Sequence, residues 1–252
     1  MRRMKDSGVE WIGEVPEHWT LSKIKYVCLF SPPCNLNFLS PDTIVGYAPM
    51  ECIKNGHHSQ LAKEYREIPK SLTVYVDNDI VMAKVTPCFE NGNIAIMSNT
   101  PSGIGFGSSE LFVFRAKQIN RTYLFYWLQN EGFRDIAVST MTGTGGLKRI
   151  SSSFITNSPI CFPPMKEQAL IAAYLDEKCS AIDSVIARQQ RLISLLKDYR
   201  ISLITEAVTK GLDRDVPMKD SGVEWIGEVP EHWQTTILSA LFSGSWEFLG
   251  AF

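Results

Sequence analysis

The sequence predicts an α+β protein, with one mainly antiparallel α+β domain over residues 1–164 and a long coiled-coil helix over residues 165–211. Three observations predict this class. Residues 165–211 contain no proline, and no glycine precedes Gly211. Short runs rich in β-branched and aromatic residues, separated by turn-forming dipeptides, fill most of residues 21–114. Finally, sixteen residues near the N-terminus recur without a mismatch near the C-terminus.

The apolar residues of the predicted helix form a stripe. Their spacing is about 3.5 residues, which is typical of a coiled-coil seam. Glu167 lies in the predicted first turn, where a negative charge suits the helix dipole, and Gly211 ends the pattern. A helix this long cannot bury its stripe within itself, so we expect a partner helix. The stripe comprises Ile171, Leu175, Ile182, Ile186, Ile193, Leu196, Leu203 and Ala207.

Strand-type runs dominate the first half of the predicted domain. Residues 71–76 and 79–85 are β-rich, and the Asp77-Asn78 dipeptide between them predicts a hairpin. Asn91-Gly92 is a second strong turn signal, and residues 93–97 follow it as a strand. These signals predict antiparallel pairing of neighbouring strands.

The second half of the predicted domain mixes strands with one helix. Residues 103–115 have a glycine-rich start and then continue as one strand. Asn120 is placed to cap a helix over residues 121–130, which has an apolar face. A flexible polar loop is expected over residues 139–153, and a final strand over residues 155–162 leads into the long helix.

The repeat is the sharpest signal in the chain. Residues 4–19 and residues 218–233 both read MKDSGVEWIGEVPEHW. The offset between them is far longer than a solenoid unit and indicates a domain-scale duplication. Trp11 and Trp19 are expected to pack the start of the chain against the domain or the helix terminus. Residues 212–252 are accordingly predicted to be a truncated second repeat with a poorly ordered tail.

Composition narrows the possible function classes. No apolar run approaches the roughly 18–20 residues that cross a bilayer, so no membrane association is expected. Six cysteines without a CxxC pair indicate reduced, mostly buried thiols and a cytoplasmic protein. The net charge is −2, yet residues 20–165 carry 13 Lys and Arg against 10 Asp and Glu. This local surplus permits DNA binding without establishing it.

Two motifs resemble enzyme signatures but lack essential parts. Ser31-Pro32-Pro33-Cys34 resembles the catalytic tetrapeptide of amino-group DNA methyltransferases, where an aromatic fourth residue stacks on the flipped base. Cys34 cannot stack, and the glycines of residues 103–107 precede a strand instead of following one. Residues 143–149, GTGGLKR, lack the spacing of a phosphate-binding loop and suit either a mobile surface loop or a contact to a DNA backbone.

The sequence does not support a metal site or a nuclease site. His57-His58 has no third ligand at metal spacing. An acidic nuclease cluster of Asp77, Asp79 and Glu90 is rejected, because Asp77 is needed in the predicted turn. We therefore expect no catalytic residue, no metal and no cofactor in this chain.

Several segments together resemble the specificity (S) subunits of type I restriction-modification enzymes. The resemblance covers nearly the whole chain except residues 234–252, and the individual segments are specific only in combination. They are VEWIGEVPEHW at 9–19, DIVMAKVTPCFENGNIAI at 79–96, GFGSSELFVFR at 105–115, GLKRISSSFITNSPICFPPMKEQ at 146–168, and residues 171–211.

This resemblance implies a non-catalytic DNA-binding subunit. In the family, each α+β target-recognition domain reads one half of a bipartite sequence in double-stranded DNA. The conserved helices form an antiparallel pair that sets the distance between the halves and docks the methyltransferase subunits, within a complex that also contains restriction subunits. Full-length members carry two recognition domains and two helices, whereas this sequence has one of each and so resembles a half-length form.

The reading surface is expected at strand ends and polar loops, and the helix stripe is expected to form a homodimer. Lys148 and Arg149 are the predicted phosphate contacts. The alternatives are a helical oligomeric scaffold without DNA binding and, less favoured, a DNA methyltransferase. The candidate DNA-binding residues are Lys84, Thr86, Glu90, Asn91, Ser108, Ser109, Lys148 and Arg149; the candidate dimer-interface residues are Ile182, Ile186, Ile193, Leu196 and Leu203.

Overall fold

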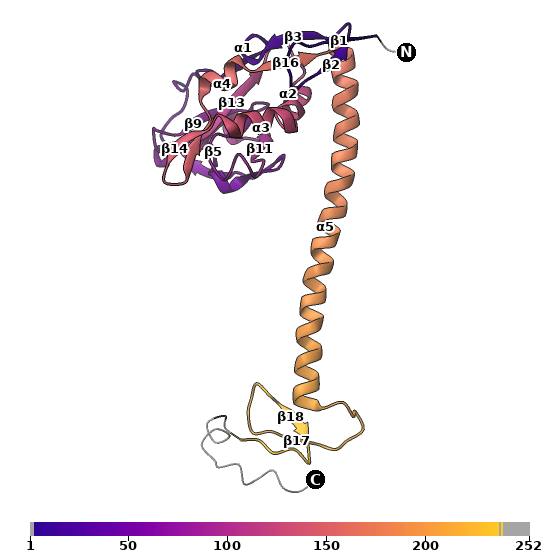
Figure 1. Cartoon of the computed structure of the whole chain (residues 1–252). Helices are drawn as coiled ribbons and strands as arrows, with labels where there is room; N and C mark the ends of the chain where they lie inside the picture. The colour runs from indigo at the N-terminus through magenta and orange to yellow at the C-terminus, as the bar shows by residue number, and fades with distance from the viewer. Residues whose placement is uncertain (1–2, 237, 239–252) are drawn as a thin grey trace. The chain divides into compact units, whose positions relative to one another are not determined.

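The computed structural model describes residues 3–236 and residue 238 (Figure 1). The chain divides into two compact units, Met1–Lys178 and Cys179–Phe252. The first unit is a mixed α+β domain with mainly antiparallel strands, and a long helix, α5 (Met165–Lys210), starts within it. The predicted fold class and the predicted long helix are thereby confirmed.

Two four-stranded sheets form the framework of the first unit. The first sheet has the order β11-β10-β13-β4 and is antiparallel throughout. The second has the order β8-β5-β12-β9, in which β5 and β12 run parallel. The strands are β4 (Cys28–Phe30), β10 (Ile80–Ala83), β11 (Ile94–Ile96) and β13 (Leu111–Ala116) in the first sheet, and β5 (Ile44–Ala48), β8 (Leu61–Glu64), β9 (Thr73–Val76) and β12 (Ile104–Gly107) in the second.

The first sheet is buried on both faces because its side chains alternate between two apolar clusters. Ile80 and Phe114 belong to the larger cluster, which also contains buried residues of the helices. Val81 and Val113 belong to a second cluster, together with Tyr75 of the second sheet. The core therefore has a helix layer, a first sheet and a second sheet.

Three short helices follow the strands, and each has a side-chain cap. Asn120 accepts from the Tyr123 amide at 3.0 Å, which confirms the predicted N-cap. The helix that it starts, α2 (Arg121–Trp127), ends earlier than predicted, and α3 (Glu131–Ser139) begins after a second cap at Asn130. The prediction of a strand over residues 155–162 is wrong for the first half of that range. Residues there form α4 (Ser152–Asn157), and the strand β16 (Pro159–Phe162) is shorter and pairs with β3 (Thr20–Lys23).

Two predicted strand arrangements are also wrong. The segments flanking Asp77-Asn78 do not form a hairpin, because β9 pairs with β12 while β10 pairs with β11 and β13. The chain passes from the second sheet to the first at this turn, where Asn78 has a φ of 74°. Likewise, the expected single strand over residues 103–115 is two strands in different sheets, β12 and β13. The turn at Asn91-Gly92 is confirmed, since it joins the antiparallel pair β10–β11.

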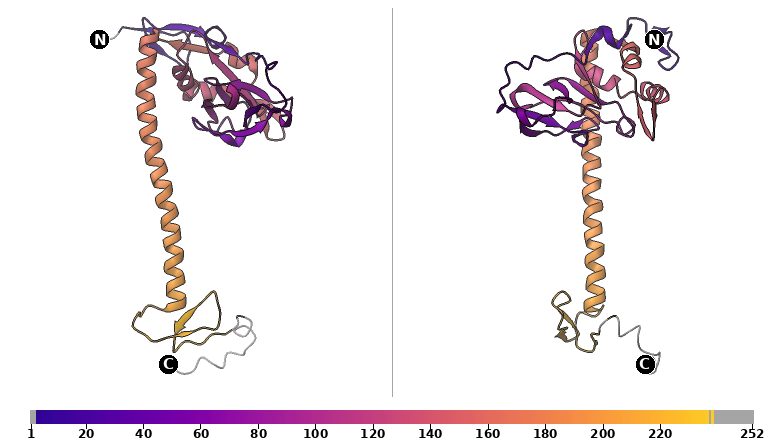
Figure 2. Two further views of the ribbon diagram at one scale, coloured as in Figure 1. Left: turned by 180° about the vertical axis from the view of Figure 1, so that it is seen from behind. Right: turned by 90° about the vertical axis from the view of Figure 1, so that its left-hand side faces the viewer.

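The first turns of α5 are fixed to the domain by polar contacts. Gln168 is 2% exposed, and its side chain accepts from the Asn120 amide at 2.7 Å and donates to the Pro163 carbonyl at 2.8 Å. His18 contacts the Glu167 carboxylate at 2.7 Å. Figure 2 shows the N-terminal segment running beside these first turns. The predicted packing of the chain start against the helix terminus is confirmed.

The remaining elements are short. Two hairpins, β1–β2 and β17–β18, come from the two copies of the repeated sequence. The elements are β1 (Met4–Asp6), β2 (Glu14–Pro16), α1 (Ile24–Val27), η1 (Met50–Cys52), β6 (Ile53–Lys54), β7 (His57–His58), η2 (Tyr65–Glu67), η3 (Pro101–Gly103), β14 (Thr142–Thr144), β15 (Leu147–Arg149), β17 (Met218–Asp220) and β18 (Glu228–Pro230).

Three further predictions concern the thiols, the membrane and the tail. All six cysteines have free thiols, but Cys28 and Cys161 alone are buried, so the expectation of mostly buried thiols is wrong. Among the described residues, no helix has the length and apolarity to span a bilayer. The predicted poor order of residues 234–252 concerns a stretch that lies mostly outside the described residues.

Candidate nucleic-acid interface

The β14–β15 hairpin is held to the domain by Thr86. The Thr86 hydroxyl donates to the Gly146 carbonyl at 2.8 Å and accepts from the Lys148 amide at 3.0 Å. The Thr86 amide also donates to the Lys148 carbonyl at 3.0 Å. The side chain of Thr86, a candidate base-reading residue from the sequence, is thus occupied in positioning the hairpin.

The hairpin projects its strands into solvent. Every residue of β14 and β15 is exposed, including Lys148 and Arg149. Gly143 has no room for a side chain, since a Cβ there would lie 2.2 Å from the Leu147 carbonyl oxygen. The sequence predicted a flexible polar loop over residues 139–153, and that prediction is wrong: a paired two-stranded ribbon occupies its centre.

Three charged side chains meet at the foot of this hairpin. Arg149 donates through Nε and Nη2 to both carboxylate oxygens of Glu110, at 3.0 and 2.8 Å. Lys84 Nζ lies 3.8 Å from the same carboxylate and donates to the Ser109 carbonyl at 2.7 Å. The cluster of Lys84, Glu110 and Arg149 therefore carries one net positive charge and joins strands β10, β13 and β15 at their ends.

Glu110 is the member of this cluster that sequence reasoning missed. The hydrogen bond from Arg149, followed by the nearby charge of Lys84, holds the pKa of the Glu110 carboxyl below its ordinary value. The same contact raises the pKa of the Arg149 guanidinium. The residue is therefore an ionised acceptor at neutral pH. In the observed register, Ala83 of β10 pairs with Leu111 of β13, and this pairing places Glu110 beside Lys84.

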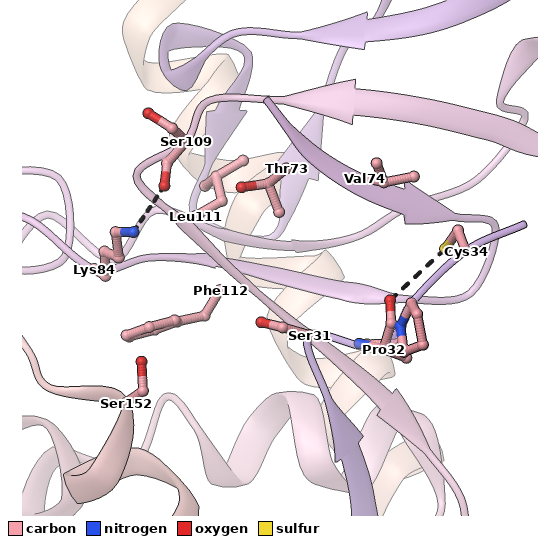
Figure 3. A pocket seen from close by; sticks show the side chains of 11 residues that line it. Ser31, Pro32, Cys34, Thr73, Val74, Lys84, Ser109, Leu111, Phe112 and Ser152 are labelled. Carbon is pink, nitrogen blue, oxygen red and sulfur yellow. Dashed lines mark hydrogen bonds between the residues drawn. The ribbon is translucent and has the colours of Figure 1, made fainter. Parts of the chain in front are cut away.

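A cavity of about 350 Å³ with both polar and apolar lining residues opens next to the cluster. Figure 3 shows Lys84 and Ser109 on its rim, with the Phe112 ring, Ser31 and Ser152 around it. The Ser31-Pro32-Pro33-Cys34 motif forms one wall, where the Cys34 thiol donates to the Pro32 carbonyl at 3.8 Å. Hydroxyl groups, an ammonium and an aromatic ring thus surround one opening.

The other candidate residues have different surroundings. The Ser108 hydroxyl accepts from the Glu110 amide at 3.2 Å and shapes the turn before β13. The Glu90 carbonyl accepts from Arg134 of α3 at 2.7 Å, and Glu90 lines a second cavity with Gln129 and residues of α3. The Asn91 amide donates to the Pro87 carbonyl at 2.9 Å. The structure therefore brings together Lys84, Thr86, Ser109, Lys148 and Arg149, whereas Glu90 contacts α3.

Helix α5 exposes two rows of apolar side chains. The five candidate interface residues, Ile182 to Leu203, are between 46% and 58% exposed. A second row repeats at similar steps along the helix and is equally exposed; it comprises Val185, Leu192, Leu195 and Tyr199. The narrow stripe expected from the sequence is therefore one part of a wider apolar band.

Comparison with known proteins decides the family. The model of the type I restriction modification DNA specificity domain matches residues 35–192, which is more than half of the chain. This chain belongs to that family. The match includes the hairpin, the Lys84–Glu110–Arg149 cluster and the first part of α5.

Curated relatives agree with this assignment. The specificity subunit of the type I restriction enzyme EcoEI from Escherichia coli is 33% identical over 72% of this chain and 31% of the relative. The EcoAI specificity subunit, also from Escherichia coli, is 31% identical over 88% of this chain and 37% of the relative. The chain therefore spans about a third of the length of these two relatives.

Solved structures share the fold. A chain from a study of complex assembly in the type I R-M system aligns with a TM-score of 0.57 at 18% identity, over 83% of this chain and 49% of the other. The HsdS subunit from Thermoanaerobacter tengcongensis aligns with a TM-score of 0.54 at 20% identity, over 81% and 53%. Both likenesses concern the fold alone.

Proposed function

We propose that this chain is the DNA-reading, non-catalytic specificity component of a type I restriction-modification system. Its recognition domain reads one half-site of a bipartite target in double-stranded DNA. The observation that carries this proposal is the positive Lys84–Glu110–Arg149 cluster at the foot of an exposed two-stranded ribbon. The major groove of B-DNA is wide enough to admit such a ribbon.

The parts of this surface suit different tasks. Lys148 on the exposed strand β15 supplies a cation for a phosphate, a contact that adds affinity and no sequence information. Arg149 is held as a fixed fork by Glu110 through Nε and Nη2, which leaves Nη1 to face a base edge or a phosphate. The hydroxyls of Ser31 and Ser152 at the adjacent cavity are suited to base edges.

The test is the salt dependence of DNA binding. We expect Lys148→Ala with Arg149→Ala to weaken binding to all sequences and to lower the slope of log K against log salt by about one to two. A matched control, Lys54→Ala with Lys70→Ala, removes the same charge from exposed lysines outside the cluster. Equal slopes for the two double variants would show that the hairpin is not a backbone contact. Absence of measurable DNA binding by the wild-type chain would favour a scaffold without DNA binding.

We further propose that the first apolar row of α5 pairs two molecules of this chain. A two-fold axis would set two identical helices antiparallel, the arrangement that a full-length family member makes from its own two helices. Burying one large aliphatic side chain of the row contributes on the order of 1–2 kcal/mol. Two identical recognition domains would then read a symmetric, interrupted palindrome.

The second apolar row is proposed to dock the methyltransferase subunits, within a complex that also includes restriction subunits. The two rows can be separated by substitution. Leu196→Asp with Leu203→Asp should convert the dimer to a monomer in light scattering at tens of micromolar. Leu192→Asp with Leu195→Asp should leave the dimer intact and prevent co-purification of the methyltransferase. A monomeric mass for the folded wild-type chain would contradict the pairing.

A further inference from the structure

The two copies of the repeated sequence fold in the same way. We call residues 4–19 the N-terminal repeat and residues 218–233 the C-terminal repeat. The register is identical, with Met4 opposite Pro16 in one and Met218 opposite Pro230 in the other. The tight turns match as well: the amide of Gly8 donates to Asp6 at 2.8 Å, and the equivalent bond of the C-terminal repeat is 2.9 Å. The sixteen residues therefore form the same hairpin in both places.

One residue distinguishes the two copies. Burial is the same at every position of the two repeats except at the first tryptophan. Trp11 is partly buried against the larger apolar cluster of the domain, whereas Trp225 is 83% exposed. Val15 and its counterpart Val229 are buried alike, at 6% and 3% exposure. The C-terminal repeat is thus fully folded, and its Trp225 lacks the packing that Trp11 has.

The slot that holds Trp11 is built from α2 and α3. The Trp11 ring lies 5.7 Å from that of Trp127, centroid to centroid. Gly132 leaves space for the indole, because a Cβ at that position would lie 2.8 Å from Trp11 Cε3. Trp19 adds an edge-on contact to Tyr123 with centroids 6.4 Å apart. This surface is shaped to receive the repeated sequence.

We propose that the C-terminal repeat is a second docking unit, whose Trp225 enters the Trp127–Gly132 slot of another molecule of this chain in place of that molecule's N-terminal repeat. The occupant follows from the structure, since the slot already holds these same sixteen residues. Indoles are enriched among the side chains that anchor protein interfaces, and Trp225 presents one on a folded hairpin. The inference rests on the proposed association of two molecules.

The two repeats would make nearly the same contacts in the slot. The covalent connection of each repeat to its own chain therefore decides which one occupies it. The two repeats offer the slot identical side chains, so neither has an intrinsic advantage there. The N-terminal repeat contacts Glu167 of the same chain through His18 and Trp19, and the C-terminal repeat carries the same two side chains as His232 and Trp233. The C-terminal repeat instead places Trp233 against Gly211, where a Cβ would lie 3.4 Å from the indole. Weakening the N-terminal contact should therefore shift the slot toward the C-terminal repeat.

Photo-cross-linking in the full-length chain tests this exchange. Glu224, the exposed neighbour of Trp225, is replaced by p-benzoylphenylalanine so that the indole is kept, and chains labelled with nitrogen-14 and nitrogen-15 are mixed before irradiation. We expect cross-linked pairs of mixed isotope that map to residues 127–132. Trp11→Ala should raise their yield by about tenfold or more, because the loss of one buried indole changes an equilibrium constant by at least that factor. Gly132→Ala, which narrows the slot but favours the helix, should reduce the yield in that background.

A competition experiment tests the same slot in a chain that keeps Trp11. Free peptide of sequence MKDSGVEWIGEVPEHW should suppress the cross-link in the otherwise wild-type chain, and the same peptide with its first tryptophan replaced by alanine should not. The absence of cross-linked pairs of mixed isotope, or pairs that map outside residues 127–132, would overturn the exchange. A dimer in light scattering without such pairs would overturn the exchange while leaving helix pairing intact, whereas a monomer would remove both.

Discussion

Replacing Thr86 with valine should loosen the β14–β15 hairpin without unfolding the domain. The substitution keeps the β-branched shape and removes a hydroxyl that donates to Gly146 at 2.8 Å and accepts from Lys148 at 3.0 Å. Each hydrogen bond contributes a net of about 0.5–1.5 kcal/mol, so the pair should stabilise the hairpin by about 1–3 kcal/mol. That difference corresponds to a factor of about 5–150 in the opening equilibrium.

Amide hydrogen exchange measures this opening directly. Exchange across residues 142–149 should accelerate by that factor in Thr86→Val, and DNA affinity should fall for all sequences alike because Lys148 is no longer preorganised. Thr156→Val is the matched control, since its hydroxyl donates to Ser152 at 2.9 Å within α4. Unchanged exchange in the hairpin of Thr86→Val would refute the assignment of Thr86 as the residue that positions it.

Further predictions concern the charge cluster and the methyl donor. Glu110→Gln should release Arg149 and Lys84, raise affinity for unrelated DNA and steepen the salt slope by about one; an affinity below that of wild type would contradict this. Because the pKa of Glu110 is lowered in the folded state from an ordinary value of 4.5, its stabilising contribution is fully present above that pH and is lost as the pH falls through the native pKa. The stability difference between wild type and Glu110→Gln in acid titrations should therefore shrink below about pH 4.5 and hold constant at neutral pH. S-adenosylmethionine should not bind the isolated chain, and stoichiometric micromolar binding in calorimetry would show that the chain carries its own methyl-donor site.

Local signals in the sequence predicted those elements whose structure is locally determined. The apolar spacing of residues 165–211 predicted a helix whose observed end, Lys210, lies beside the predicted stop at Gly211. Asn120 and Asn91-Gly92 act through hydrogen bonds and backbone conformations within a few residues, so the sequence alone predicts their roles. The repeat predicted two equivalent units, and the structure has the same register in both.

What the sequence missed depends on contacts between distant residues. A turn at Asp77-Asn78 shows that the chain changes direction, but not that β9 and β10 join different sheets. Nothing in the local sequence distinguishes Glu110 from other acidic residues. Its position beside Arg149, 39 positions away, follows from the pairing of strands. The sequence predicts a loop at the β14–β15 hairpin because its glycines and polar residues carry no strand pattern. Its pairing depends on Thr86, some sixty residues earlier.

Methylation mapping is the most direct measurement of whether this chain selects DNA sequence for a type I system. Genomic DNA would be compared between cells that contain the methyltransferase subunits with the wild-type chain, with the Lys148→Ala and Arg149→Ala double variant, or with no specificity chain. We expect methylation at a symmetric, interrupted palindrome that requires the wild-type chain and is reduced by the double variant. Methylation that is independent of the chain, or that marks two unrelated half-sites, would contradict it.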